Sequence, residues 1–324
     1  MLVTESVVRV RDLRMRYGDK DVLTGVDLDI HAGEVVCLLG PNGAGKTTTI
    51  EILEGFRIRS AGEVEVLGQD PAAATEDWRA RTGVVLQSWR DHPRWTARRL
   101  LTQLGEYYRP YSTPDRPRPH DVEDLLETVG LGGLADQKLT TLSGGQRRRL
   151  DVAIGIVGRP DLLFLDEPTA GFDPQARREF HDLIRRLSRV DRTTILLTTH
   201  DLDEAERLAT RVLVLAGGRI VADDTVDGLA RQVAGETVVR WRRGGQAFTE
   251  RVPDGTAFVR TLLAEHGDEV TDLEVRRSSL EDAYLGLVLQ HEAGHGDAAA
   301  RLFSEASAPS APSAPSAPSP GVSA

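Results

Sequence analysis

Hydrophobic and polar residues alternate along the first part of the chain, which is typical of strands with one buried face. The alternation covers residues 7–17 and 22–30 and returns at 62–68. Between these segments, residues 34–40 form a continuous apolar run that predicts a fully buried strand, and residues 45–56 predict a helix. We therefore expect an antiparallel layer beside a buried strand that leads directly into a helix.

The middle of the chain alternates between strands and helices. A helix end and a strand are expected at 78–87, apolar strands at 161–166 and 193–199, a helix at 173–190 between them, and a hairpin at 211–222. Strands that alternate with helices favour an α/β core with a mainly parallel sheet. Residues 90–158 are mostly helical in pattern, broken by a proline-rich stretch at 109–120, and predict a helical insertion.

After about Thr225 the pattern changes to that of a small α+β unit. Its expected elements are strands at 237–242, 246–252 and 270–276, a helix at 257–267, and a last helix that starts with a capping box of Ser279 and Asp282. The end of the chain repeats Ser-Ala-Pro and lacks residues that could form a core. These patterns predict a main domain at 1–224, an α+β extension at 225–290 and a disordered tail at 291–324.

Composition narrows the class of protein. The 324 residues are 40% hydrophobic and 28% charged, as in a globular protein of about two domains. The net charge of −10 argues against non-specific nucleic-acid binding as the main purpose. Cys37 is the single cysteine and is expected in the core. The chain begins without a basic segment and long apolar run, and no window is apolar enough to span a bilayer, so any membrane part is expected in another chain.

The stretch "GPNGAGKT" follows the buried strand and precedes a helix, which is the context of a phosphate-binding P-loop. Its backbone N–H groups and the helix N-terminus would hold phosphates, Lys46 would reach the β- and γ-phosphates, and Thr47 would bind Mg²⁺. The candidate nucleotide-binding residues here are Gly40, Pro41, Asn42, Gly43, Ala44, Gly45, Lys46, Thr47 and Thr48.

The apolar strand "LLFLDEP" ends in two carboxylates. Asp166 at the strand end is placed to hold Mg²⁺, and Glu167 next to it could polarise an attacking water. Together with the P-loop, these residues predict a Mg²⁺-dependent nucleoside triphosphatase.

A third motif, "LSGGQ" at 142–146, identifies the kind of triphosphatase. It matches the signature of the ATP-binding cassette (ABC) family without a mismatch, and the match extends through residue 174. Residues 7–223 resemble an ABC ATPase domain throughout. The resemblance implies a P-loop fold with a RecA-like core, an antiparallel β-subdomain and a helical subdomain, and it implies ATP and Mg²⁺ as ligands.

Four more residues are carried over from the family pattern. Tyr17 resembles the aromatic residue that stacks on adenine, and Gln87 resembles the Q-loop glutamine that contacts metal or water. Asp173 resembles the D-loop aspartate, although Phe172 stands where leucine is usual. His200 resembles the switch histidine at the γ-phosphate, so the expected catalytic set is Lys46, Gln87, Glu167 and His200.

The family pattern also implies partners. Two cassettes pair head to tail, so that Ser143, Gly144, Gly145 and Gln146 of one chain close on ATP held by the P-loop of the other. The second cassette is expected to be another copy of this chain. A separate transmembrane permease would hold both at the cytoplasmic face of the membrane, near Gln87 and the segment that follows it. Trp89, His92 and Trp95 are candidate permease contacts, with ordinary packing as an equal alternative.

Three function classes remain to be compared. The ATP-hydrolysing subunit of a transporter fits best. A soluble ABC ATPase acting on ribosomes or DNA is the alternative, but ribosome-type members generally carry two cassettes and DNA-repair members carry coiled coils that this chain lacks. A kinase is disfavoured by "LSGGQ". The extension, with "VTDLEVRRSSLEDAYLGL", resembles daunorubicin-resistance-type subunits, which implies export of drugs, antibiotics or lipid-like compounds.

A zinc-protease pattern, "HEAGH" at 291–295, is a weak competitor. The pattern requires a regular helix that places both histidines on one face. Gly294 lies inside it and Gly296 follows, so we do not expect zinc chemistry there.

Overall fold

The fold was analysed in a computed structural model of the 324-residue chain. The structure describes residues 6–85, 94–169, 172–190, 193–233 and 237–277, together with 281, 284 and 288. The predicted Ser279–Asp282 capping box, the "HEAGH" stretch, the tail at 291–324, and Gln87, Trp89 and His92 lie outside the described residues.

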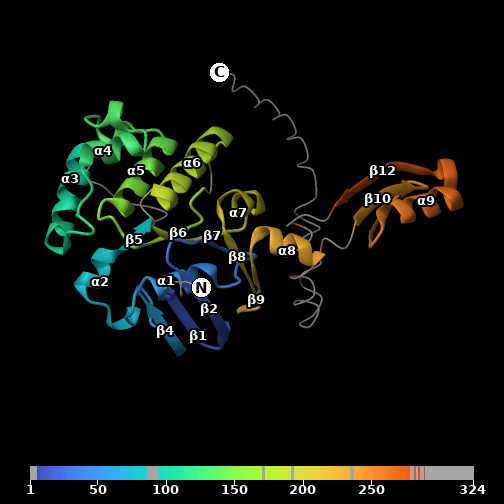
Figure 1. Ribbon diagram of the computed structural model, residues 1–324, viewed down its shortest axis with the longest axis horizontal. Coiled ribbons are helices and arrows are strands. Elements are labelled where there is room, and N and C mark those ends of the chain that lie inside the picture. The colour runs from blue at the N-terminus through green and yellow to red at the C-terminus, as the bar shows by residue number, and fades with distance from the viewer. Residues whose placement is uncertain are drawn as a thin grey trace, which may run out of the picture.

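A six-stranded sheet forms the centre of the main body, in the order β5-β6-β7-β3-β8-β9 (Figure 1). All neighbouring strands are parallel except β8 and β9, which form the expected hairpin. This arrangement confirms the α/β core with a mainly parallel sheet. The strands are β3 Val35–Leu39, β5 Thr82–Val85, β6 Leu162–Asp166, β7 Thr194–Thr199, β8 Arg211–Ala216 and β9 Arg219–Asp224.

A second, antiparallel sheet lies against the first in the order β2-β1-β4. Its strands are β1 Ser6–Tyr17, β2 Lys20–His31 and β4 Ala61–Val66, and their alternating burial follows the sequence pattern. One hydrophobic cluster joins the inner faces of both sheets with helix α1, Lys46–Leu53. Cys37 is buried in β3, as expected.

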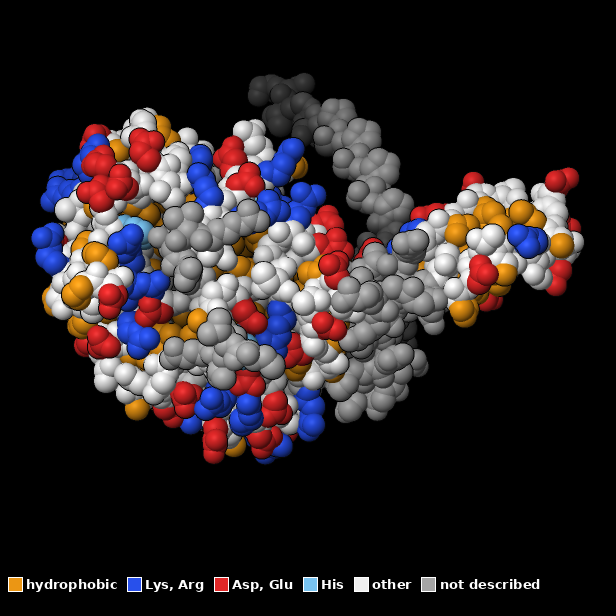
Figure 2. Space-filling model, viewed as in Figure 1, with side chains coloured by type: hydrophobic (Ala, Val, Ile, Leu, Met, Phe, Trp, Pro, Cys, Tyr) orange, Lys and Arg blue, Asp and Glu red, His pale blue; other side chains and the backbone are white. Residues whose placement is uncertain are grey.

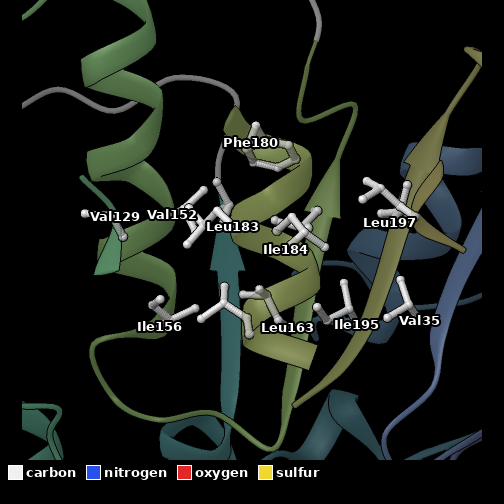
Figure 3. Packing of buried hydrophobic residues seen from close by; sticks show 14 of the residues in the cluster. Val35, Val129, Val152, Ile156, Leu163, Phe180, Leu183, Ile184, Ile195 and Leu197 are labelled. Carbon is white, nitrogen blue, oxygen red and sulfur yellow. The ribbon is translucent and has the colours of Figure 1, made fainter. Parts of the chain in front are cut away.

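Helices α5, Gly144–Ile156, and α6, Pro174–Val190, pack on the other face of the large sheet. In Figure 3, Leu183 of α6 lies beside Val152 of α5, and Ile184 lies on the side of α6 nearer Ile195 and Leu197 of β7. Sheets covered on both faces carry continuous apolar strands, which explains why β3 is apolar throughout and β6 is apolar up to Asp166. Two short helices that the sequence patterns did not single out, α7 Leu202–Leu208 and α8 Val226–Val233, complete this side.

The predicted helical insertion extends from the sheet edge near β5 to β6 (Figure 1). Its main elements are α3 Ala97–Tyr108, α4 Val122–Thr128 and α5, and helix α2, Glu76–Arg81, comes directly before β5. The proline-rich stretch between α3 and α4 contains a cis peptide bond between Arg118 and Pro119. Because α5 begins at residue 144, the insertion presents the "LSGGQ" turn at a helix N-terminus.

The C-terminal unit is a three-stranded antiparallel sheet, β11-β10-β12, with helix α9 on one face. Its elements are β10 Thr237–Arg243, β11 Gln246–Val252, α9 Gly255–His266 and β12 Val270–Arg277. Its small core centres on Val239, Trp241 and Leu262. After the C-terminal unit, the helical residues Tyr284 and Val288 pack in the large hydrophobic core of the main body. Leu229 of α8 belongs to the same core.

Positive and negative side chains are interspersed over the face of the molecule shown in Figure 2. Hydrophobic side chains gather on the C-terminal unit on the side where β12 lies, consistent with exposed Leu273 and Val275. Within the described part of the chain, no helix combines the length and apolar character needed to cross a membrane.

Candidate active site

The P-loop connects the C-terminal end of β3 to the N-terminus of α1. Gly43 and Gly45 have positive φ angles of 82° and 105°, a backbone region that favours glycine. A Cβ on Gly45 would lie 2.6 Å from a methyl of Leu23, and one on Gly40 would lie 2.5 Å from the Leu215 carbonyl oxygen. The loop backbone therefore passes so close to its neighbours at Gly40 and Gly45 that a side chain at either position would clash.

Lys46 is the first residue of α1, and its side chain is only 6% exposed. Its Nζ donates hydrogen bonds to the carbonyl oxygens of Gly40 at 2.9 Å and Pro41 at 3.3 Å. The same nitrogen lies 3.4 Å from Oε1 of Glu167. The ammonium is thus held inside the loop curve, directed toward the carboxylate that ends β6.

Asp166 closes β6 beside the P-loop helix. Its Oδ2 accepts a hydrogen bond from the Thr47 hydroxyl at 3.1 Å, and its Oδ1 accepts one from the Thr198 hydroxyl at 2.5 Å. Hydroxyl and carboxylate oxygens are the ligands that Mg²⁺ prefers. Thr47 and Asp166, predicted from separate motifs, are therefore adjacent and form an oxygen-donor pair that fits Mg²⁺ with a bound triphosphate.

Glu167 follows immediately and adopts a positive φ of 43°, which is rare for a residue with a side chain. Its backbone N–H donates to the Thr198 hydroxyl oxygen at 3.0 Å, which holds this conformation. His200 approaches the same carboxylate, with Nδ1 3.3 Å from Oε1 of Glu167. Backbone strain of this kind gathers at functional sites, and here it directs Glu167 between Lys46 and His200.

The "LSGGQ" turn forms a closed helix start. The Ser143 hydroxyl accepts from the Gln146 N–H at 3.3 Å, and the Gln146 side-chain oxygen accepts from the Ser143 N–H at 2.9 Å. This capping box leaves the positive end of the α5 dipole facing outward, where it favours an anion. Gly144 has open space at its Cβ position, so a ligand can approach the backbone there closely.

A hollow of about 650 Å³ lies in front of this turn. It is bounded by Ser143 through Arg149, Asp151, Phe172, Asp173, Gln175, Ala176 and Glu179. P-loop residues do not line it within the described chain. The signature turn therefore opens into a space that belongs to the D-loop and α6, separate from the phosphate loop.

Asp173 caps α6, because its Oδ1 accepts from the N–H groups of Gln175 and Ala176, both at 2.9 Å. The Ala176 and Gln175 N–H groups hold the pKa of the Asp173 carboxyl below its usual range. Phe172, the departure from the family pattern, packs edge-on against Phe180 with ring centroids 5.9 Å apart. Phenylalanine therefore anchors this loop to the core in place of leucine.

Tyr17 ends β1 with 39% of its surface exposed. The Arg57 guanidinium carbon lies 5.1 Å from the centre of its ring, within cation–π range. Arg57 Nε also donates to Glu51 of α1 at 2.6 Å. A chain of contacts therefore ties the proposed adenine-stacking ring to the helix that carries Lys46.

Of the candidate permease contacts, only Trp95 lies within the described residues. Trp95 is half-buried against the large core, its carbonyl accepts from the Leu139 N–H at 3.0 Å, and the Arg99 guanidinium lies over its ring at 5.3 Å. These contacts support the packing interpretation of Trp95.

Sequence reasoning missed two residues at the site. Thr198 bonds both Asp166 and Glu167, and it is fully buried. Glu54 lies just beyond α1, where burial, with the charges of Asp166 and Glu51, raises the pKa of its carboxyl to about 8. Both were hidden because their roles depend on which strands and helices are neighbours.

Residues 23–170 match the sequence profile of the family described as "ABC transporter". The "Daunorubicin resistance ATP-binding protein DrrA2" of Streptomyces coeruleorubidus is 38% identical over 308 residues, covering 86% of this chain and 94% of that protein. The "Daunorubicin/doxorubicin resistance ATP-binding protein DrrA" of Streptomyces peucetius is 42% identical, covering 84% and 89%. The "Nod factor export ATP-binding protein I" of Burkholderia lata is 40% identical, covering 71% and 74%.

Solved structures agree at the level of the fold. One described as an ATP binding subunit of an ABC transporter has a TM-score of 0.61 at 23% identity, covering 87% of this chain and 99% of that chain. A dimeric bacterial ABC transporter cassette has a TM-score of 0.56 at 24% identity, covering 67% and 98%.

Proposed function

Because this chain belongs to the ABC transporter family and its relatives are named as resistance or export ATP-binding proteins, we propose that it hydrolyses ATP to drive export through a separate permease. The proposal rests above all on one observation: Lys46 and His200 both approach the Glu167 carboxylate, beside the Thr47–Asp166 pair. The names of the relatives mention daunorubicin, doxorubicin and Nod factor, and we propose drugs or lipid-like compounds as the cargo of this chain. The names do not favour a soluble ATPase acting on ribosomes or DNA.

Different residues of the site bind different parts of the nucleotide. Backbone N–H groups of the P-loop and the Lys46 ammonium hold the β- and γ-phosphates, and Tyr17 stacks on the adenine. Thr47 and Asp166 would hold Mg²⁺, and Gln87 of the Q-loop is the further candidate ligand. Bound Mg²⁺ would neutralise charge on the phosphate oxygens.

Hydrolysis requires a water in line with the γ-phosphorus. Glu167 accepts a hydrogen bond from that water and orients it, while His200 contacts the γ-phosphate and shares the Glu167 carboxylate. Lys46 and the helix N-termini offset the negative charge that develops in the transition state. Catalysis in this scheme is mainly positioning, which suits residues held by a buried threonine and a strained backbone.

We further propose a head-to-tail pair of these chains as the active unit. The signature turn faces a hollow that the described P-loop residues of the same chain do not line. A phosphate bound at the N-terminus of α5 would therefore belong to a nucleotide held by the P-loop of a second chain. ATP bound between Lys46 of one chain and Ser143 of the other would hold the pair together. Loss of the γ-phosphate would release it, which provides the mechanical step.

The permease would dock in a mainly apolar groove between the main body and the helical insertion. The groove has a volume of about 460 Å³, and its wall includes Trp78, Leu104 and Tyr108. Phe56 at its wall is 67% exposed, and nearby Ile58 is 75% exposed. Exposed apolar side chains of this kind mark protein-interaction sites, and this groove would place the chain at the cytoplasmic membrane face.

A fractionation experiment tests the proposed function. The chain is expressed alone and with a polytopic permease encoded beside it, and the membrane fraction is then assayed for the chain. Association with the membrane only in the presence of the permease, together with ATP-dependent uptake of cargo into inverted vesicles, is the expected result. The proposal would be contradicted if the chain stayed in the soluble fraction and its ATPase activity were the same with and without the permease.

A further inference from the structure

His181 of α6 and Glu204 of α7 form a buried pair that the roles given above do not use. Nε2 of His181 lies 3.7 Å from Oε1 of Glu204, and the two side chains are 4% and 1% exposed. That separation exceeds hydrogen-bond distance. His181 Nε2 and both Glu204 oxygens make no hydrogen bond within the described residues.

Stability alone does not explain such a pair. A buried carboxylate and imidazole lose hydration, and without a hydrogen bond between them this loss is poorly offset. Replacing both members of a buried polar pair by apolar residues of similar size is often neutral or stabilising. Unsatisfied buried groups of this kind call for a functional explanation.

The position of the pair suggests that function. Helix α6 begins directly after Asp173, and α7 begins two residues after His200. The first turns of the two helices are joined by an ion pair between Arg177 and Asp201 at 2.9 Å. His181 lies one turn beyond Arg177, and Glu204 lies three residues beyond Asp201. The buried pair therefore forms a second, deeper link between the helix of the D-loop and the helix of the switch histidine.

A third helix also reaches this region. Arg148 of α5 donates from Nε to the carbonyl oxygen of Pro168 at 3.0 Å, one residue after Glu167. Burial lowers the pKa of Arg148, and the charges of Asp151, Asp166 and Glu204 oppose that shift. Glu204 of α7 therefore lies within electrostatic range of α5 and also faces His181 of α6. The carboxylate therefore links α7, which follows His200, to α6, which follows Asp173, and it lies within electrostatic range of α5, which follows Ser143.

We propose that Glu204 and His181 are positioning residues for ATP hydrolysis. The pair sets how α7 sits against α6, and thereby where His200 stands relative to Glu167 and the D-loop. An approach of about 0.7 Å between the two side-chain atoms would complete a hydrogen bond, so the pair can tighten when the two helices move together. The proposal rests on the role given above to His200.

The test separates this role from stability by removing the whole pair. In purified full-length chain, His181→Leu with Glu204→Leu should unfold at or above the wild-type Tm, because both buried polar groups are gone. Its Kd for ATP should stay within about twofold, while kcat falls about tenfold, since sub-ångström misplacement of a catalytic group costs rate rather than affinity. A wild-type kcat for this double variant would overturn the proposal.

Two further variants guard against a folding artefact. Glu204→Gln keeps a hydrogen-bonding group of the same shape. If the geometry of the pair is what matters, this variant should retain kcat within about threefold. Leu187→Met repacks α6 away from the pair at similar volume and should leave kcat unchanged. A loss of kcat in Leu187→Met equal to that in the double leucine variant would show that any disturbance of α6 suffices, and would overturn the proposal.

His200→Ala distinguishes failure of this inference from failure of the proposed function. If His200→Ala hydrolyses ATP normally, the role of His200 is wrong and the pair has nothing to position. If His200→Ala is inactive while the double leucine variant is fully active, only the inference fails. We expect His200→Ala and the double leucine variant both to lose activity while still binding ATP.

Discussion

The hydroxyl of Thr198 donates a hydrogen bond to Oδ1 of Asp166 at 2.5 Å, and the Thr198 hydroxyl oxygen accepts one from the backbone N–H of Glu167 at 3.0 Å. One buried side chain on β7 thus fixes both acidic residues at the end of β6. The relationship follows from the register of the sheet, in which Asp166 and Thr198 are paired. The carboxylate proposed to hold Mg²⁺ and the one proposed to orient water share a single anchor.

Thr198→Val should therefore reduce hydrolysis far more than ATP binding. The substitution keeps the shape but removes both hydrogen bonds, and we expect kcat to fall by about ten- to a hundredfold, with KM within about threefold. Steady-state phosphate release measures this. Thr194→Val, at the opposite end of the same strand, removes a buried hydroxyl that accepts from Gly33 and should leave kcat near wild type. Equal losses in both variants would contradict a specific role for Thr198.

Glu167→Gln should trap an ATP-bound dimer. The amide keeps the size of the side chain but no longer accepts a proton or orients water as a carboxylate does. We expect hydrolysis to fall by at least about a hundredfold and size-exclusion chromatography with ATP and Mg²⁺ to show a stable dimer that ADP does not support. Rapid turnover by this variant would refute the role of Glu167.

Tyr17 and Arg57 should affect affinity for ATP rather than kcat. Stacking of a base on an aromatic ring contributes about 1–3 kcal/mol, so Tyr17→Ala should raise the Kd for ATP by at least about fivefold, and Tyr17→Phe should not. Arg57→Ala should raise the Kd by less, because the guanidinium only holds the Tyr17 ring in place and the ring itself remains to stack on the adenine. Titration calorimetry with each variant measures the change. An unchanged Kd in Tyr17→Ala would place the adenine elsewhere.

Glu54 should make stability depend on pH. The pKa of its carboxyl is raised from 4.5 to about 8, first by burial and then by the charges of Asp166 and Glu51. Between these values the folded protein binds a proton on Glu54 that the unfolded chain does not, so the free energy of unfolding falls as pH rises through this window. Glu54→Gln removes this dependence.

The Tm of Glu54→Gln relative to wild type should therefore rise from about pH 5 to about pH 8.5, by at least about 2 °C. Thermal unfolding across this range measures the difference. Glu63→Gln, on the exposed side of β4, is a matched control and should show a flat difference. A flat difference for Glu54→Gln as well would show that the carboxyl is not protonated in the folded protein.

Much of the fold could be predicted because hydrophobic periodicity reports burial directly. The mainly apolar segments 34–40 and 161–166 became β3 and β6, and their ends carry the P-loop and the Asp166–Glu167 pair as expected. The alternating segments became the antiparallel sheet. Helices α7 and α8 have seven and eight residues, too few turns for a clear period, and the patterns did not reveal them.

The parts of the site that escaped prediction depend on register and packing. Thr198 looks like any other residue of an apolar strand until β6 and β7 are aligned. Arg57 approaches Tyr17 from a segment 40 positions away, and no local pattern connects them. His181 resembles a polar position of an amphipathic helix, yet it faces Glu204 in the interior. The motif residues were predictable because each carries its own local context.

Each ATP is proposed to lie between the P-loop of one chain and the signature turn of another. Lys46→Ala should weaken phosphate binding, and Ser143→Arg should block the signature turn while sparing ATP binding; each homodimer should be inactive. A tandem-tagged heterodimer of the two variants has one composite site in which the P-loop and the signature turn are both intact.

The measurement is ATP hydrolysis by that purified heterodimer. We expect activity to return, up to about half the wild-type rate per dimer, because one of two equivalent sites is complete. If each chain instead used its own signature turn, neither chain would have a complete site. An inactive heterodimer that still binds ATP, or full activity of Ser143→Arg as a monomer, would contradict the account.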